Sequence, residues 1–171
     1  MKISFRPFDE KGRARIFQLI SKSNQFNLTT KRYTKNDLLQ FENKENYFMR
    51  QIRLKDIFGD NGMICVIICK KNTDAWEIDS WLMSCRVLER KVEIVCLQYI
   101  IQHAHKSGVK KLVGKFIPTQ RNMIVKDHYK KLGFSRVSKD SEIEVWELNI
   151  QDFNFQDVPI KLAHHNDILD D

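Results

Sequence analysis

Glycine, proline and long apolar runs are all scarce in this sequence. Only 6 glycines and 3 prolines occur among 171 residues, which excludes collagen-like chains and Gly/Pro-rich linkers. The longest apolar run, residues 63–69, ends at Lys70 and is far shorter than the roughly 20 residues of a membrane-spanning helix. Charges at Lys2, Arg6 and Asp9 break the amino-terminal segment, which therefore does not resemble a secretory signal. We expect a cytoplasmic protein that does not engage a membrane.

Metal-ligand patterns are missing as well. The chain has 4 cysteines and 5 histidines, and none of them forms a C-x-x-C pair or the cysteine-histidine spacing of a zinc site. Cys65, Cys69 and Cys96 lie in apolar segments, where free cysteine usually packs as a small buried side chain. The histidines are His103, His105, His128, His164 and His165. We expect no metal centre.

The overall composition is that of a globular protein. Hydrophobic residues make up 42% and charged residues 30% of the chain, which is typical of one compact domain at this length. Lysine and arginine outnumber aspartate and glutamate by 29 to 22, which gives a net charge of +7 and favours an acidic partner. Because the basic residues are scattered among the acidic ones and no recognition motif occurs, we expect no nucleic-acid binding.

The spacing of apolar residues predicts an α+β fold with one αβ crossover. The predicted elements are, in order, strand 2–8, helix 13–23, helix 35–42, strands 47–55, 63–69 and 76–85, helix 92–107, strand 110–117, helix 122–132 and strand 143–148. Asn122 is expected to cap the start of the last helix, and Gly133 to end it. In this prediction residues 1–151 form the domain, and residues 152–171 form a carboxyl-terminal tail whose last residues fray.

The strongest functional signal is the short loop, residues 86–91, that joins the strand ending at Cys85 to helix 92–107. The first N–H groups of a helix have no partner inside the helix and favour a negative group. Arg86, Arg90 and Lys91 add positive charge beside them. The pattern indicates an anion site, although a charged loop that is simply hydrated accounts for the same sequence.

Two features of the chain resemble the GCN5-related N-acetyltransferase superfamily. One is the strand-loop-helix unit with Arg86 as the first loop residue, and the other is the segment from Asn122 through Tyr129 to Phe134. Further segments resemble, more narrowly, the carboxyl-terminal acyltransferase-like domain of FkbH-like proteins. They are residues 24–30, 32–33, 58–62, 76–79, 81–82, 84–88 and 112–114. The resemblance implies a mixed, mostly antiparallel sheet flanked by helices.

The resemblance to FkbH-like proteins implies an acyltransferase that acts on acyl carrier protein thioesters. In that family the role is to form glyceryl or related three-carbon extender units for polyketide-type biosynthesis. The implied cofactor is the phosphopantetheine arm of the carrier protein, or acetyl or acyl coenzyme A. The implied partners are the carrier protein and a haloacid-dehalogenase-like phosphatase domain, fused or separate. An alternative is a non-catalytic module that docks the carrier protein and has lost coenzyme A binding.

The loop departs from the superfamily pattern at two positions. The pattern Gln/Arg-x-x-Gly-x-Gly/Ala places glycines where this chain has Glu89 and Lys91. Side chains there crowd the approach of a phosphate, and Glu89 adds a like charge. A phosphopantetheine arm has one phosphate where coenzyme A has several, so the departure favours a carrier-protein thioester. We expect cofactor contacts from Arg86, Arg90, Lys91 and Asn122.

Three residues are candidates for catalysis. Cys85 lies beside Arg86 and the start of a helix, surroundings that favour a nucleophilic thiolate, and it can pass an acyl group from a thioester or acyl phosphate to the carrier thiol. Asp79 shares the strand parity of Cys85 and is the candidate general base. Tyr129 stands at the superfamily position of the group that protonates a leaving thiolate. Each residue also has a non-catalytic interpretation: Cys85 as a buried core residue, Asp79 on the solvent-facing side of its strand, and Tyr129 as a core packing residue.

The substrate is expected to meet the loop between the first two helices, where this superfamily usually binds its acceptor. Polar side chains in this loop suit a hydroxylated acyl group such as glyceryl. They belong to Asn24, Asn27, Thr29 and Arg32. Glu77 has the same strand parity as Asp79 and is a further candidate for orienting a substrate hydroxyl. An ordinary polar loop and a solvent-facing strand account for the same residues.

Overall fold

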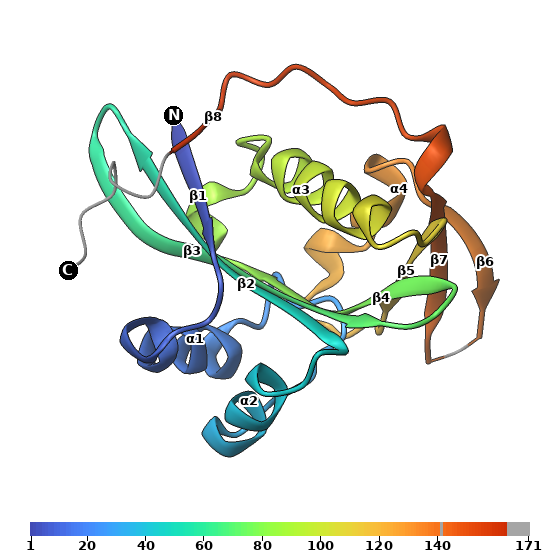
Figure 1. Cartoon of the computed structure of the whole chain (residues 1–171), viewed down its shortest axis with the longest axis horizontal. Coiled ribbons are helices and arrows are strands. Elements are labelled where there is room, and N and C mark those ends of the chain that lie inside the picture. The colour runs from blue at the N-terminus through green and yellow to red at the C-terminus, as the bar shows by residue number, and fades with distance from the viewer. Residues whose placement is uncertain (141, 164–171) are drawn as a thin grey trace.

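Eight β-strands form one sheet in the computed structural model (Figure 1), which describes residues 1–140 and 142–163. The strands are β1 (Lys2–Arg6), β2 (Tyr47–Asp56), β3 (Gly59–Lys71), β4 (Ala75–Met83), β5 (Lys111–Phe116), β6 (Ser135–Lys139), β7 (Glu144–Asn149) and β8 (Lys161–Leu162). Their order across the sheet is β6-β7-β5-β4-β3-β2-β1-β8. β4 pairs with β5, and β1 with β8, in parallel, whereas the other neighbours are antiparallel. The predicted α+β class and mostly antiparallel sheet are confirmed.

Helices cover both faces of the sheet. They are α1 (Glu10–Lys22), α2 (Lys35–Glu42), α3 (Val92–Lys106) and α4 (His128–Lys131). Figure 1 shows α1 and α2 on one side of the sheet and α3 and α4 on the other. The Asp9 carboxylate caps α1 by accepting from the amide of Gly12 at 2.6 Å. Thr34 and Asp37 form a capping box at the start of α2.

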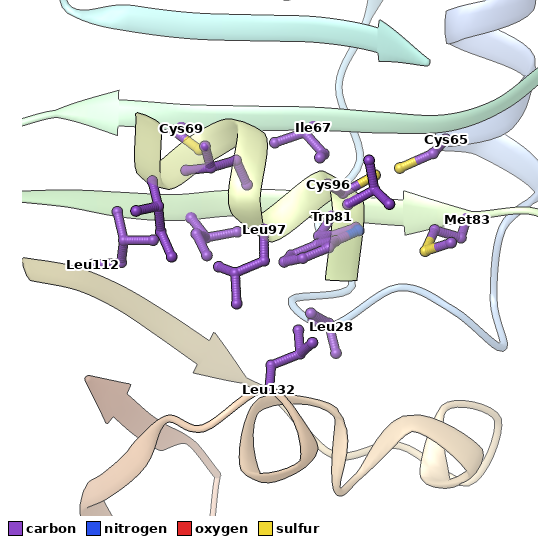
Figure 2. Close-up of a cluster of buried hydrophobic side chains, with 14 of the residues drawn as sticks. Leu28, Cys65, Ile67, Cys69, Trp81, Met83, Cys96, Leu97, Leu112 and Leu132 are labelled. Atoms are coloured by element: carbon purple, nitrogen blue, oxygen red, sulfur yellow. The ribbon is translucent and has the colours of Figure 1, made fainter. Parts of the chain in front are cut away.

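The sheet separates two apolar cores. Between the sheet and α3, Trp81, Leu97 and Leu112 lie together (Figure 2). On the opposite face, Ile16 of α1 and Leu38 of α2 pack against the sheet. β4 is buried along both faces because helices cover both sides of it. This burial fixes the end of β4, from which the functional loop starts.

β4 and β5 pair along only part of their length. Their register runs from Ala75 with Lys111 to Ile78 with Gly114, and beyond it residues 26–29 lie between the two strands. The amide of Met83 donates to the carbonyl of Phe26 at 3.4 Å, and the amide of Ile117 donates to that of Leu28 at 2.9 Å. The loop after α1 therefore takes the place of a sheet partner at the carboxyl ends of both strands.

The end of β4 differs from the prediction. The strand stops at Met83, and Cys85 begins a 3-10 turn (Cys85–Val87). The amide of Ser84 makes the last contact with the sheet, a hydrogen bond of 2.8 Å to the carbonyl of Ile64. Strand alternation therefore does not reach Cys85. The predicted shared parity of Cys85 with Asp79 and Glu77 was wrong, because Cys85 is not a strand residue.

The predicted helix 122–132 was also wrong in its first half. A 3-10 turn (Met123–Val125) comes first, and α4 follows it. Asn122 does not cap a helix, because its side-chain amide is used in other contacts. Its Nδ2 donates to the carbonyls of Asn27 at 3.0 Å and Ile117 at 2.9 Å. Asn122 therefore connects this segment to the loop that lies between β4 and β5.

Some elements were not predicted. β6 follows Gly133, and β8 lies within the segment predicted as a tail, where it pairs with β1. Ile160, next to β8, is buried. The turn between β2 and β3 is formed by residues 57–58, and β3 already begins at Gly59, four residues before the predicted strand 63–69. The predicted fraying concerns residues 164–171, which lie outside the described residues.

Candidate active site

The loop from residue 85 to residue 91 contains two non-glycine residues with positive φ angles. Glu89 has a φ of 63° and Lys91 a φ of 62°, which is the left-handed region that favours glycine. These are the two positions where the superfamily pattern has glycines. The cost is of order 1–2 kcal/mol for each residue. The loop therefore retains a glycine-like path although neither residue is glycine.

Arg90 anchors this loop to the turn between β2 and β3. Its Nη2 lies 2.6 Å from Oδ2 of Asp56. This hydrogen bond, with one from the amide of Phe58, lowers the pKa of Asp56 to about 2. Arg86 and Lys91 are exposed, and in the described part of the chain neither has a carboxylate partner. Charge for an anion therefore comes from Arg86 and Lys91, because Arg90 is already neutralised.

Cys85 is exposed, whereas Cys65, Cys69 and Cys96 are buried. Its side chain lines a cleft of about 660 Å³, here called the α1 cleft. The cleft lies between the carboxyl end of α1, residues 23–26, the end of β4 and residues 120–121. A thiol in such an opening is accessible to a small molecule. The alternative of a buried, structural Cys85 does not apply.

Other residues of the same loop line a second, smaller cavity. This α3 pocket has a volume of about 160 Å³ and is lined by residues of the loop, α3 and the segment around α4. The residues are Phe26, Leu88, Glu89, Glu93, Ile94, Ile124, Val125, His128, Lys131 and Leu132. Phe26 lines both cavities. Phe26, which is 3% exposed, is therefore a residue that the two cavities share.

Two buried polar atoms of the α3 pocket have no hydrogen-bond partner among residues 1–140 and 142–163. They are Oε2 of Glu93 and Nε2 of His128. His128 is 7% exposed, and its ring makes edge contacts with Phe26 and Trp81 at centroid distances of 4.9 and 4.6 Å. A buried polar atom without a partner is costly. An apolar ligand segment that carries an amide or another polar group would satisfy both atoms.

Burial lowers the pKa of His128 to about 3, so the ring is neutral in the folded protein at neutral pH. The unfolded chain binds the proton near pH 6.5, and acid therefore favours unfolding by roughly 1.4 kcal/mol per pH unit between about 6.5 and 3. Urea unfolding at pH 6.5 and 4.5 measures this effect. Between pH 6.5 and 4.5, we expect the free energy of unfolding of the wild type to fall by roughly 2 kcal/mol more than that of His128→Phe. Equal losses would contradict a buried neutral His128.

Asp79 forms a closed ionic cluster. Its side chain is 0% exposed and lies 3.3 Å from Nζ of Lys70. Lys31 and Tyr33 also donate to the two carboxylate oxygens. Burial opposes ionisation, but these hydrogen bonds and charges outweigh it and lower the pKa of Asp79. Asp79 does not line the α1 cleft, and its role as a general base stays a prediction.

Tyr129 and Glu77 also lie apart from Cys85. Tyr129 is 1% exposed, and its buried hydroxyl has no hydrogen-bond partner among the described residues. Burial raises the pKa of Tyr129, and its ring packs against that of Phe134 at a centroid distance of 4.9 Å. Glu77 pairs with Lys115 at 3.1 Å. Neither Tyr129 nor Glu77 lines the α1 cleft or the α3 pocket, so their proposed roles stay predictions.

The predicted substrate residues divide into two groups. Asn24, Asn27 and Arg32 line a cavity of about 340 Å³ next to the α1 cleft, and Asn24 lines both. Thr29 instead donates to the carbonyl of Asp79 at 2.8 Å and holds the loop in place. The structure therefore brings Asn24 close to Cys85 and leaves Thr29 in a supporting position.

Several cavity residues were missed by the sequence analysis. Arg15 and Lys22 fall within the predicted helix 13–23 but were not candidates for a site, and Arg121, Glu93 and His128 carried no spacing signal. Their convergence depends on how α1 and the segment before α4 meet the end of β4. Local periodicity does not contain that information.

No group of three metal-binding side chains occurs within residues 1–140 and 142–163. His164 and His165, whose spacing matched no metal-ligand pattern, lie outside the described residues. None of the helices in the described part of the chain is long and apolar enough to cross a membrane.

No protein-family model matches the chain, and no curated protein matches it closely enough to count as a relative. Solved structures do match. The ribosomal-protein-S18-alanine N-acetyltransferase from Escherichia coli has a TM-score of 0.66 at 12% identity, over 98% of this chain and 99% of that one. The PaiA N-acetyltransferase from Thermoplasma acidophilum, in complex with coenzyme A, has a TM-score of 0.71 at 14% identity, over 87% and 99%. Ard1 from Thermoplasma volcanium has a TM-score of 0.66 at 13% identity, over 87% and 98%.

These similarities show the fold. The chain has the fold of the GCN5-related N-acetyltransferases, as the resemblance in its sequence implied.

Proposed function

We propose that this protein transfers an acyl group between the thiol of Cys85 and the phosphopantetheine thiol of an acyl carrier protein. One observation carries the proposal. The loop 85–91 contributes to two cavities, with Cys85 in the α1 cleft and Leu88 and Glu89 in the α3 pocket. An arm held in the α3 pocket would bring its thioester to the exposed sulfur past Phe26, the residue that lines both cavities, so the transfer requires the Phe26 side chain to move aside.

The size of the α3 pocket favours a carrier-borne arm over coenzyme A. Small-molecule sites usually measure roughly 300–1,000 Å³, whereas this pocket has about 160 Å³. It has room for a slender, amide-bearing chain but not for a nucleotide. The loop also presents Glu89 where a phosphate would approach, which disfavours the several phosphates of coenzyme A.

The chemistry of the transfer needs only Cys85 and water. Sγ of Cys85, as the thiolate, attacks the carbonyl carbon of the arm's thioester, and the bond from that carbon to the arm's sulfur breaks. The thiol proton passes to water in the cleft, and the departing sulfur takes a proton from water. The reverse sequence loads the arm from an acylated Cys85. No step passes through Asp79 or Tyr129, because both side chains are closed off from the cleft.

The resemblance to FkbH-like proteins supports a particular acyl group and a second partner for this transfer. The acyl group would be glyceryl or a related three-carbon unit in polyketide-type biosynthesis. A haloacid-dehalogenase-like phosphatase domain, fused or separate, would then be the second partner.

A second candidate is a docking module without catalysis. Two observations favour it. Residues 26–29 lie between the ends of β4 and β5, and Glu89 and Lys91 carry side chains at the two loop positions where the superfamily pattern has glycine. Such a module would hold a carrier protein for a partner enzyme and would not need its prosthetic arm.

Calorimetric titration with a carrier protein that bears the arm, the same carrier without it, and coenzyme A separates these functions. We expect the arm to tighten binding at least about tenfold, which corresponds to roughly 1.4 kcal/mol. Ile94→Phe, which narrows the α3 pocket, should remove this preference, whereas the exposed Ile57→Phe should keep it. Equal binding of both carriers would support docking alone. Tight coenzyme A binding without a carrier response would overturn the proposal.

A further inference from the structure

Within the part of the chain that the structure describes, the charged side chains that line the α1 cleft are all cations, and none is a carboxylate. Arg15, Lys22 and Arg121 contribute the charges, and the remaining lining side chains are amides, hydroxyls, apolar groups and the Cys85 thiol. Other cations near the sheet are paired, as Lys115 is with Glu77. An opening on a folded protein usually mixes both signs of charge. The α1 cleft therefore has a uniformly positive lining next to an exposed thiol.

The cavity beside the cleft extends the same pattern. It shares Asn24, Gln120 and Arg121 with the cleft and adds Arg32. The guanidinium of Arg32 donates to the carbonyl of Ser23 at 2.9 Å and to Oδ1 of Asn24 at 2.7 Å, which are neutral acceptors. The charge of Arg32 is therefore not cancelled by a carboxylate.

None of these four cations forms an ion pair in the part of the chain that the structure describes. Arg15 donates to the amide oxygen of Gln18, and no ion pair involves Lys22, Arg32 or Arg121. Unpaired cations around one opening raise the local concentration of anions and repel cations. The volume of about 660 Å³ falls within the usual range for a metabolite-sized ligand.

We infer that the α1 cleft binds a small organic anion, with a carboxylate or a phosphate group, and excludes cationic amines. Binding of an anion in the cleft does not depend on the proposed function. Only the further statement, that this anion exchanges an acyl group with Cys85, rests on the proposed function. An amine acceptor, which an N-acetyltransferase uses, would meet three positive charges in the cleft, a fourth from Arg32 beside it, and no carboxylate of the described residues. The nucleophile that takes the acyl group from Cys85 on this side is then a hydroxyl or thiol of an anionic molecule. Its oxygen or sulfur bonds to the acyl carbon, the bond to Sγ breaks, and its proton returns to Cys85.

Alkylation of Cys85 tests the charge of the cleft without a carrier protein or an acyl donor. Iodoacetate and iodoacetamide both convert the thiol to a thioether and release iodide, but only iodoacetate is an anion. The ratio of their rates at Cys85, followed by peptide mass spectrometry, reports the local potential. The combined variant Arg15→Gln, Lys22→Gln, Arg121→Gln should lower this ratio roughly tenfold, given the usual size of such electrostatic enrichment. Added salt should lower the wild-type ratio towards that of the variant.

A matched control removes three exposed charges elsewhere. Lys106→Gln, Lys110→Gln, Lys130→Gln gives the same net charge, and none of these residues lines the cleft. It should leave the ratio within about twofold of wild type, because charges outside the opening are largely screened at ordinary salt. An equal fall in both variants, or no fall in either, would overturn a cationic cleft.

Protection of Cys85 from iodoacetamide identifies the ligand class. Four probes share one three-carbon skeleton: glycerate, glycerol 3-phosphate, glycerol and 3-amino-1,2-propanediol. We expect at least one anion to slow alkylation about threefold or more at millimolar concentration, while the neutral and cationic probes have no effect. Protection by glycerate alone or glycerol 3-phosphate alone tells a carboxylate from a phosphate site. Protection by the amine, or by none of the four, would overturn the inference. Failure of this test leaves the arm-dependence of carrier binding unaffected, so the two proposals fail separately.

Discussion

Replacing Cys85 with serine is expected to abolish acylation of the protein by a carrier-bound thioester. The hydroxyl of serine is a far weaker nucleophile than a thiolate when no base is adjacent, and among the described residues no carboxylate or histidine lines the α1 cleft. Incubation of wild-type protein with an acylated carrier should increase its intact mass by one acyl group. In Cys85→Ser the acylated fraction should fall by roughly a hundredfold or more.

The other cysteines provide an internal control for this experiment. Cys65, Cys69 and Cys96 remain in both proteins and are buried. Peptide mapping should therefore place the adduct on Cys85 alone. An adduct of equal amount in Cys85→Ser, or an unmodified wild-type protein, would contradict a nucleophilic role and would favour docking without catalysis.

Replacing Gly114 with alanine is expected to cause the largest loss of stability. A Cβ at this position would lie 2.4 Å from Cε1 and Cζ of Tyr129. The ring cannot move away easily, because it is 1% exposed and packs against Phe134 and Trp146. Overpacking of this kind usually lowers the free energy of unfolding by roughly 1–3 kcal/mol, and we expect a decrease of about 3 kcal/mol here. In thermal unfolding this corresponds to a decrease in Tm of roughly 6–12 °C.

The double variant Gly114→Ala, Tyr129→Leu separates the clash from other effects. Tyr129→Leu removes the ring edge that the new Cβ would meet, so adding Gly114→Ala to it should cost clearly less than adding it to the wild type. If Gly114→Ala is as stable as the wild type, or if its cost is the same in both backgrounds, the close packing of Tyr129 on β5 is contradicted.

The architecture was easier to predict from the sequence than the site. Long periodic segments such as residues 92–107 and the alternating strands were placed correctly, because each buries its own regular pattern of apolar residues. The short β8 and the position of residues 26–29 were not predicted. Both depend on contacts with strands that are far away in the chain, and a local pattern does not encode such contacts.

Individual site residues show the same division. The loop 86–91 was recognised from its place before a helix, and Cys85, which was predicted to end the strand before it, is exposed. The interpretation of Asp79 as a neighbour of Cys85 extended strand alternation past Met83, where the strand ends. His128 and Glu93 gave no signal, because their unpartnered atoms matter only in the pocket that three separate segments enclose.

The proposed function depends above all on entry of a carrier protein's prosthetic arm into the α3 pocket. Methyl NMR of protein labelled at isoleucine detects this entry directly, in a titration with a carrier whose arm bears a non-hydrolysable thioether in place of the thioester. We expect the signals of Ile94 and Ile124 to shift with the arm-bearing carrier and not with the carrier that lacks the arm, while those of Ile16 and Ile160 stay in place. Unchanged Ile94 and Ile124 signals, in a titration where the carrier binds, would contradict arm entry.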